Sequence, residues 1–584
     1  MFRVYSKILR RPKTCLFYLP TMNFSFDKES LDILAQLDEK LMKDGDSTIR
    51  SDPHVYKKKD TVVYIKNLQE QAKFLSLLKI NSSLALTIGI EKSIVTALIL
   101  NNLKGVGTHD SVSFASSTDI PISLTGLGNI INFTGAPIIP SLTEQENKIE
   151  LQSSSETVGL ISGLQGAPYK RNLVSRQLYT GHMRIDLNQP MVENNFIVLK
   201  GPSNAGKNLV VKDMIHYFLN EETEEDRRVI YITSSLKDAR NLHENVLGEE
   251  RSKCTVVSSQ EMYNNAAEVY LMPRAGLVLA QKLVEKKCNV LLIFDKIIDY
   301  DVKEKQIFDN AKQPFAPTNI FSEIMENCGD FGPGKGKMTS VVVADTDTLN
   351  IEHERSMTNL RTHLESIADQ IIEFEPSFKS MKSSLPKLDL LTFTGFNQDY
   401  WQKPLIASIR KDLEHFSHLL KDAYRNNKNK RDYGIQEDPW ENYLYHDSQF
   451  IIPLINHQEP LDIITQILLF KFIHRTVGDD AYADSDWNEC ISEHLQKPKD
   501  LIASLKHFSK SYNEFPNQRT ISDIIQTHLN SEFPKNSFED WNIAEEEVFK
   551  INEQIDQFLK MFYTNAKING GLRPHKLDYW KNIV

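Results

Sequence analysis

The chain has 584 residues, of which 40% are hydrophobic and 25% charged, with a formal net charge of −10 at pH 7. This length predicts several domains of ordinary globular composition, and the acidic balance argues against a broadly basic nucleic-acid-binding surface, though not against a local patch. The apolar runs are too short and interrupted for a membrane-spanning helix, and the five cysteines are scattered without the spacing of a zinc site, as is typical of a reducing compartment.

The first 26 residues contain no aspartate or glutamate. An acid-free start that mixes basic and apolar residues is typical of a mitochondrial transit peptide, so we expect residues 1–26 to direct the chain to the mitochondrial matrix. A disordered basic tail is the alternative. The basic residues are Arg3, Lys7, Arg10, Arg11 and Lys13.

A small β-rich unit is expected at residues 80–145. Its runs SLALTIGI, SIVTALIL and DSVSF are separated by glycine and polar turns, which predicts a small N-terminal β-barrel. The preceding residues, 27–79, have a charged pattern with leucines at helical spacing, so we expect a helical extension there. The glycine-punctuated run at 125–138 reads as a connection to the next domain.

The strongest motif is a phosphate-binding loop. The run FIVLK at 196–200 is typical of a buried parallel strand, and apolar residues recur at helical spacing from residue 209. Between them, GPSNAGK has the spacing of a loop whose backbone N–H groups and helix dipole face a phosphate chain. A glycine-containing turn with no ligand is the alternative. The candidate nucleotide-binding residues are Gly201, Asn204, Ala205, Gly206, Lys207 and Asn208.

Two candidate Mg²⁺ ligands accompany this loop. Asn208 stands where a serine or threonine hydroxyl normally ligates the metal, and its amide oxygen would reach a different place. Asp295 ends the apolar run NVLLIFD, where phosphate-loop proteins keep a carboxylate that holds Mg²⁺ through water, although it could simply cap the next turn. We therefore expect ATP or ADP to bind, with Mg²⁺ as a candidate, and do not expect efficient hydrolysis.

The remaining chain divides into an alternating and a purely helical part. Across residues 146–385, apolar strands alternate with helical patterns, which predicts a parallel, doubly wound α/β sheet. Residues 386–566 have helical spacing throughout, and 567–584 form a tail. Residues 424–450 mix basic side chains and tyrosines that could bind RNA. A solvated loop anchored by one hydrophobic stretch is the commoner explanation for such a segment.

This order of domains resembles the alpha and beta head subunits of rotary ATP synthases, and alpha more closely. The run YTGHMRID at 179–186, which leads into the phosphate-binding loop, is similar to the family's segment there, with Thr180, Gly181 and Asp186 in place. ADQIIEFE at 368–375 resembles a later strand. The resemblance spans roughly residues 80–565 and implies a multidomain α/β fold: a β-barrel, a RecA-type nucleotide-binding domain and a helical bundle.

The resemblance also implies positions for catalytic groups, and those positions are altered. Where the family has glutamate or glutamine after the second strand of the nucleotide-binding domain, this chain has Ser234, which is too short to orient a water molecule. The region that corresponds to the family's catalytic arginine, at 392–397, contains none. Because such an arginine is worth roughly 10³–10⁵ in rate in other nucleotide triphosphatases, we predict a degenerate ATPase without catalytic residues.

Three functions are consistent with these observations. The first is a non-catalytic nucleotide-binding protein that acts as a structural or regulatory factor in mitochondrial biogenesis, either in ATP synthase assembly or in mitochondrial gene expression. Its partners would be ATP synthase head subunits or the mitochondrial expression machinery. The second is a genuine, divergent alpha-type subunit of an ATP synthase. The third is an RNA-acting ring ATPase, which the missing arginine disfavours.

Overall fold

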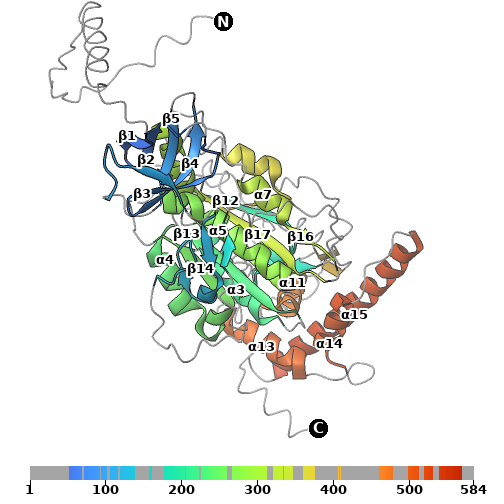
Figure 1. The fold of residues 1–584 in the computed structure, drawn as a ribbon. Coiled ribbons are helices and arrows are strands. Elements are labelled where there is room, and N and C mark those ends of the chain that lie inside the picture. Colours follow the sequence, from blue (N-terminus) through green and yellow to red (C-terminus); the bar gives the residue numbers. More distant parts are fainter. Residues whose placement is uncertain are drawn as a thin grey trace, which may run out of the picture. The chain divides into compact units, whose positions relative to one another are not determined.

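The structure is a computed structural model of the chain (Figure 1). It describes residues 52–68, 71–91, 94–100, 105–115, 119–138, 157–160, 176–187, 190–203, 205–221, 225–259, 266–311, 320–332, 334–345, 360–374, 405–406, 408–409, 460–477, 498–511, 519–530 and 538–568.

The first domain is a six-stranded antiparallel sheet with the order β1-β2-β5-β4-β3-β6. It curls until its two edges meet: His54 forms a bridge with Ser111, and the backbone N–H of Val55 donates to the carbonyl of Asp110 at 2.9 Å. The expected β-barrel is therefore confirmed as a curled, barrel-like sheet. Its strands are β1 (His54–Lys59), β2 (Val62–Lys66), β3 (Leu77–Ile80), β4 (Ser83–Ile90), β5 (Ile94–Ile99) and β6 (Val112–Phe114).

The expected helical extension at 27–79 is wrong from His54 onward, because β1, β2 and most of β3 lie there. The strands HVYKKK and VVYIK are rich in β-branched and aromatic residues, and a two-residue loop joins them with Asp60 at a φ of 54°. β1 pairs with β2, and β2 pairs with β5, so neighbours distant in sequence complete the sheet, which local helical spacing could not foresee. The barrel-like domain thus begins at His54 rather than at residue 80, and residues 27–51 lie outside the described residues.

The second domain is built on an eight-stranded sheet with the order β18-β12-β17-β15-β13-β14-β8, all parallel, to which β16 (Gly329–Asp330) adds as an antiparallel strand beside β17. The parallel α/β prediction is confirmed. The edge strand β8 (Ile130–Ile131) comes from the expected connection at 125–138. The other strands are β12 (Phe196–Gly201), β13 (Arg227–Thr233), β14 (Cys254–Ser258), β15 (Asn289–Phe294), β17 (Lys337–Asp345) and β18 (Gln370–Glu373).

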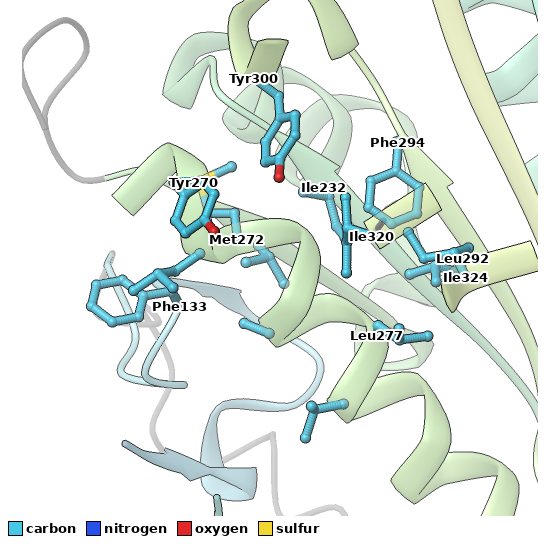
Figure 2. Close-up of a cluster of buried hydrophobic side chains, with 14 of the residues drawn as sticks. Phe133, Ile232, Tyr270, Met272, Leu277, Leu292, Phe294, Tyr300, Ile320 and Ile324 are labelled. Atoms are coloured by element: carbon cyan, nitrogen blue, oxygen red, sulfur yellow. The ribbon is translucent and has the colours of Figure 1, made fainter. Parts of the chain in front are cut away.

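Alternate side chains of these strands enter two separate cores. Ile197 and Leu199 pack with α3 (Lys207–Asn220), whereas Phe196 and Val198 belong to the core that contains α5 (Ala266–Glu285). Figure 2 shows part of the α5 core, with Phe294 and Tyr300 among its side chains. The rings of Phe294 and Phe321 also meet edge-on in this core, with centres 5.9 Å apart. This core also contains side chains of α6 (Ile297–Ala311) and α7 (Ile320–Asn327). The sheet is thus covered on both faces, as its nearly continuous apolar strands require.

Short elements complete this domain. The strands β7 (Pro121–Ser123) and β9 (Thr157–Gly159) pair with each other, as do β10 (Gln177–Leu178) and β11 (Met191–Val192). Two short helices, α2 (Met183–Asp186) and α4 (Leu236–Arg240), lie before β12 and after β13 in the chain.

The last part of the chain is helical, as expected. Phe508, Phe558 and Phe562 pack against one another in its core, with ring centres 5.4 to 6.3 Å apart. The described helices are α11 (Ile463–Val477), α13 (Pro498–Ser511), α14 (Ile521–Asn530) and α15 (Phe538–Ile568). None of the helices in the described ranges is long and apolar enough to cross a membrane. Residues 424–450, weighed above as an RNA-contacting segment, lie outside those ranges.

Candidate nucleotide-binding site

The candidate loop runs from the carboxyl end of β12 to the N-terminus of α3. Gly206 precedes the helix at a φ of 90°, a conformation that favours glycine. Gly201 ends β12, and a Cβ added there would lie 2.6 Å from the Cβ of Phe374 and 2.8 Å from its carbonyl oxygen. Both glycines therefore satisfy backbone requirements of the strand–loop–helix unit. Ala205 is buried, Asn208 is exposed in the first turn of α3, and Asn204 lies outside the described residues.

Lys207 is held inside the loop rather than extended into solvent. Its side chain is 3% exposed, and its ammonium group donates to the carbonyl oxygens of Gly201, at 2.9 Å, and Pro202. The same Nζ lies 2.8 Å from Oδ1 of Asp345, the last residue of β17. Asp345 is directly opposite Gly201 in the β12–β17 register, which places its carboxylate beside the loop.

Asp345 was not among the site residues predicted from the sequence. Its signal was present, because Asp345 ends the apolar run SVVVAD just as Asp295 ends NVLLIFD. What distinguishes the two is strand order, since β17 is the neighbour of β12 and β15 is one strand further away.

Asp295, the second candidate metal ligand, is buried just beyond β15 and accepts a hydrogen bond of 2.7 Å from the hydroxyl of Tyr231. Burial raises the pKa of this carboxyl group above its ordinary value. Asn208 is thus exposed in the first turn of α3, after β12, whereas Asp295 is buried just beyond β15. Among the described residues, no three His, Cys, Asp or Glu side chains gather closely enough to hold a metal ion.

Ser234 lies just after β13, and its hydroxyl donates to Oδ2 of Asp299 at 2.5 Å. A small pocket beside it is lined by Ser234, Asp295 and Lys296 together with apolar side chains of α5 and α6. Lys296 in turn forms an ion pair with Asp238. Ser234, which the resemblance sets at the family's water-orienting position, is therefore engaged with a neighbouring carboxylate.

The segment at 180–186 is fixed by the carboxylate of Asp186. Its Oδ1 accepts hydrogen bonds from the backbone N–H and the hydroxyl of Thr180, and its Oδ2 accepts one from the backbone N–H of Gly181, all at 2.8 to 2.9 Å. Nε2 of His182 lies 2.9 Å from Oδ2 of Asp213, on α3. The His182–Asp213 contact ties the segment to the helix that follows the loop.

Residues 181–368 match the ATP synthase alpha/beta family, nucleotide-binding domain. The chain is a distant, alpha-like relative of ATP synthase head subunits. It is 22% identical over 283 residues to ATP synthase subunit alpha of Mesoplasma florum, a match that covers 46% of this chain and 51% of that protein. For subunit alpha of Buchnera aphidicola subsp. Baizongia pistaciae, the identity is 24% over 292 residues, or 49% and 54% of the two chains.

A third relative, ATP synthase subunit alpha 1 of Legionella pneumophila strain Paris, is 25% identical over 286 residues, which cover 46% of this chain and 54% of that one. The chain thus spans about half the length of the curated relatives it matches. The resemblance read from the sequence is confirmed. It is centred on the domain that carries Lys207.

Proposed function

We propose that the chain binds ATP or ADP at the loop from Gly201 to Asn208, with Mg²⁺ as a candidate companion, and does not hydrolyse it appreciably. The observation that carries this proposal is the position of Lys207, whose buried ammonium lies at the junction of strand, loop and helix. That junction is where backbone N–H groups and the helix dipole favour a phosphate chain.

The non-catalytic part of the proposal rests on what surrounds the loop. Asn208 stands in place of the hydroxyl that would ligate Mg²⁺. Its amide side chain is longer than that of serine or threonine, and the residue is exposed. Ser234 carries no charge with which to polarise water, and its hydroxyl is committed to Asp299. The two replacements weaken metal binding and water activation, which are separate requirements of phosphoryl transfer.

For the biological role, we propose a structural or regulatory factor in mitochondrial biogenesis, either in ATP synthase assembly or in mitochondrial gene expression. The likeness to alpha subunits supports partners among ATP synthase head subunits, and the acid-free start of the sequence supports the mitochondrial matrix. A divergent alpha-type subunit is the second candidate, favoured by the same likeness. On a blue-native gel, co-migration with the whole synthase supports the second candidate and a different size supports the first.

Nucleotide binding is tested by titrating the purified full-length chain with fluorescent ADP and ATP analogues. We expect Lys207→Ala to weaken binding by roughly 10- to 100-fold, the range for losing a hydrogen bond to a charged group. Lys212→Ala is the matched control, because Lys212 lies on α3 but beyond the loop, and it should leave affinity unchanged. Absence of binding in the wild type, or equal affinity in Lys207→Ala, would contradict the proposal.

A further inference from the structure

The ammonium group of Lys207 has all of its donors engaged within its own chain. A lysine ammonium carries three N–H bonds. Their partners are the carbonyl oxygens of Gly201 and Pro202 and Oδ1 of Asp345. A phosphate oxygen can therefore reach Lys207 only by replacing one of these three acceptors.

Asp345 is the acceptor that can leave. The two carbonyl oxygens belong to the backbone at the end of β12 and the start of the loop, where Gly201 is packed against Phe374. The Asp345 side chain, by contrast, is 28% exposed and stands on the last residue of β17, so its carboxylate can turn toward water. Lys207 itself is almost completely buried and cannot follow it.

We propose that Asp345 competes with phosphate for Lys207 and thereby sets the nucleotide affinity of the loop. This inference rests on the proposed nucleotide binding. The carboxylate supplies the negative charge that a buried ammonium needs, because an unpaired buried charge is strongly unfavourable. A phosphate chain offers the same charge, but it must displace Asp345 and then tolerate a carboxylate nearby, or be joined to it by a cation.

The competition is tested by measuring ADP and ATP affinity of the full-length chain, with and without Mg²⁺, for the wild type and Asp345→Asn. Asparagine keeps the shape of the side chain and removes its charge. Asp330→Asn is the matched control, because Asp330 also stands at a strand end, faces a lysine at 3.9 Å and has a similarly exposed side chain. A double variant, Lys207→Ala with Asp345→Asn, shows whether any gain requires the lysine.

We expect Asp345→Asn to raise nucleotide affinity on the order of tenfold, Asp330→Asn to leave it unchanged, and the gain to vanish in the double variant. Without added nucleotide, Asp345→Asn should also melt several degrees lower than the wild type, because the buried ammonium loses its counter-charge.

The outcomes separate the two proposals. If the wild type binds and Asp345→Asn binds equally or more weakly, the competition is refuted and nucleotide binding stands. If only Asp345→Asn binds, the competition is supported and the wild type is not a nucleotide-binding protein under these conditions. If neither variant binds although both are folded, both proposals fall.

Discussion

The side-chain amide of Gln466 donates a hydrogen bond of 2.9 Å to Oδ2 of Asp186, across 280 residues of sequence. Both side chains are completely buried. The pair joins α11 to the segment that precedes the phosphate-binding loop, and the backbone N–H of Leu461 donates to the carbonyl of Gly181 beside it. Asp186 thus connects the nucleotide-binding domain to the C-terminal helices.

Removing this carboxylate should be costly. Asp186→Ala leaves the donors of Thr180, Gly181 and Gln466 without their acceptor, so we expect a loss of about 3 kcal/mol or more in the free energy of unfolding. Gln466→Ala should cost less, about 1–3 kcal/mol. Gln557→Ala, at an exposed glutamine on α15, is the control and should change stability by less than about 0.5 kcal/mol. Urea unfolding followed by circular dichroism measures all three.

Gly201 should not tolerate a side chain, because a Cβ there meets the backbone of Phe374 as well as its side chain. We expect Gly201→Ala to destabilise the chain by roughly 1–3 kcal/mol, as overpacking does. Gly107→Ala is the control, since its Cβ would have ordinary contacts of 3.7 Å or more with Asp110. Equal melting temperatures for the two variants would show that the backbone near Phe374 can move to admit a Cβ at Gly201.

Ionisation of the buried Asp295 carboxyl group should lower the free energy of unfolding near neutral pH. Burial raises the pKa of its carboxyl group above the value in the unfolded chain, so folding favours the protonated form. Its stability contribution is therefore complete below the unfolded-state pKa of about 4 and is lost as pH rises through the folded-state pKa. Asp295→Asn cannot ionise and keeps an oxygen for the Tyr231 hydroxyl.

We accordingly expect Asp295→Asn to melt above the wild type near neutral pH, with the difference shrinking toward a pH of about 4. Thermal unfolding across this range measures it. Asp295→Ala is the contrast, because it also removes the acceptor for Tyr231 and should melt below Asp295→Asn throughout. A difference between Asp295→Asn and the wild type that does not depend on pH would contradict this account.

Restoring a hydroxyl after the lysine should improve binding without creating an enzyme. Asn208→Thr is expected to tighten Mg²⁺-dependent nucleotide binding, because threonine supplies the missing ligand. Ser234 still cannot orient water, so phosphate release should stay far below about one turnover per second, the lower end of ordinary enzymes. Phosphate release and nucleotide titration, measured on the same protein, check both statements. Wild-type turnover near that rate would overturn the proposal that the chain does not hydrolyse nucleotide.

The acid-free start should direct a passenger protein. We expect a fusion of residues 1–30 to a fluorescent reporter to localise to mitochondria, because the basic residues lie among apolar ones without any acid up to residue 26. A version with its arginines and lysines replaced by glutamine is the control and should stay diffuse. A diffuse signal from the unaltered fusion would remove the mitochondrial proposal.

The central domain was readable from the sequence because its signals are local. Strands buried on both faces are continuous apolar runs, and the glycines at 201 and 206 lie at the junction of such a run with a helical pattern. The strand before the loop, at 196–200, and the apolar run that ends at Asp295 could therefore be placed along the chain before any contact was known. The strands β1 to β3 were missed, because they are short, β1 ends in three consecutive lysines, and their pairing with other strands of the sheet is not a local signal.

The partners of the key charged groups were decided by tertiary structure alone. Lys207 and Asp345 are far apart in sequence and meet only because β12 and β17 are neighbours in register, which places Asp345 opposite Gly201. Asp186 and Gln466 meet only because α11 packs beside the segment before the loop. Local spacing indicates which side chains are buried, whereas strand order and helix packing determine which buried polar and charged side chains lie in contact.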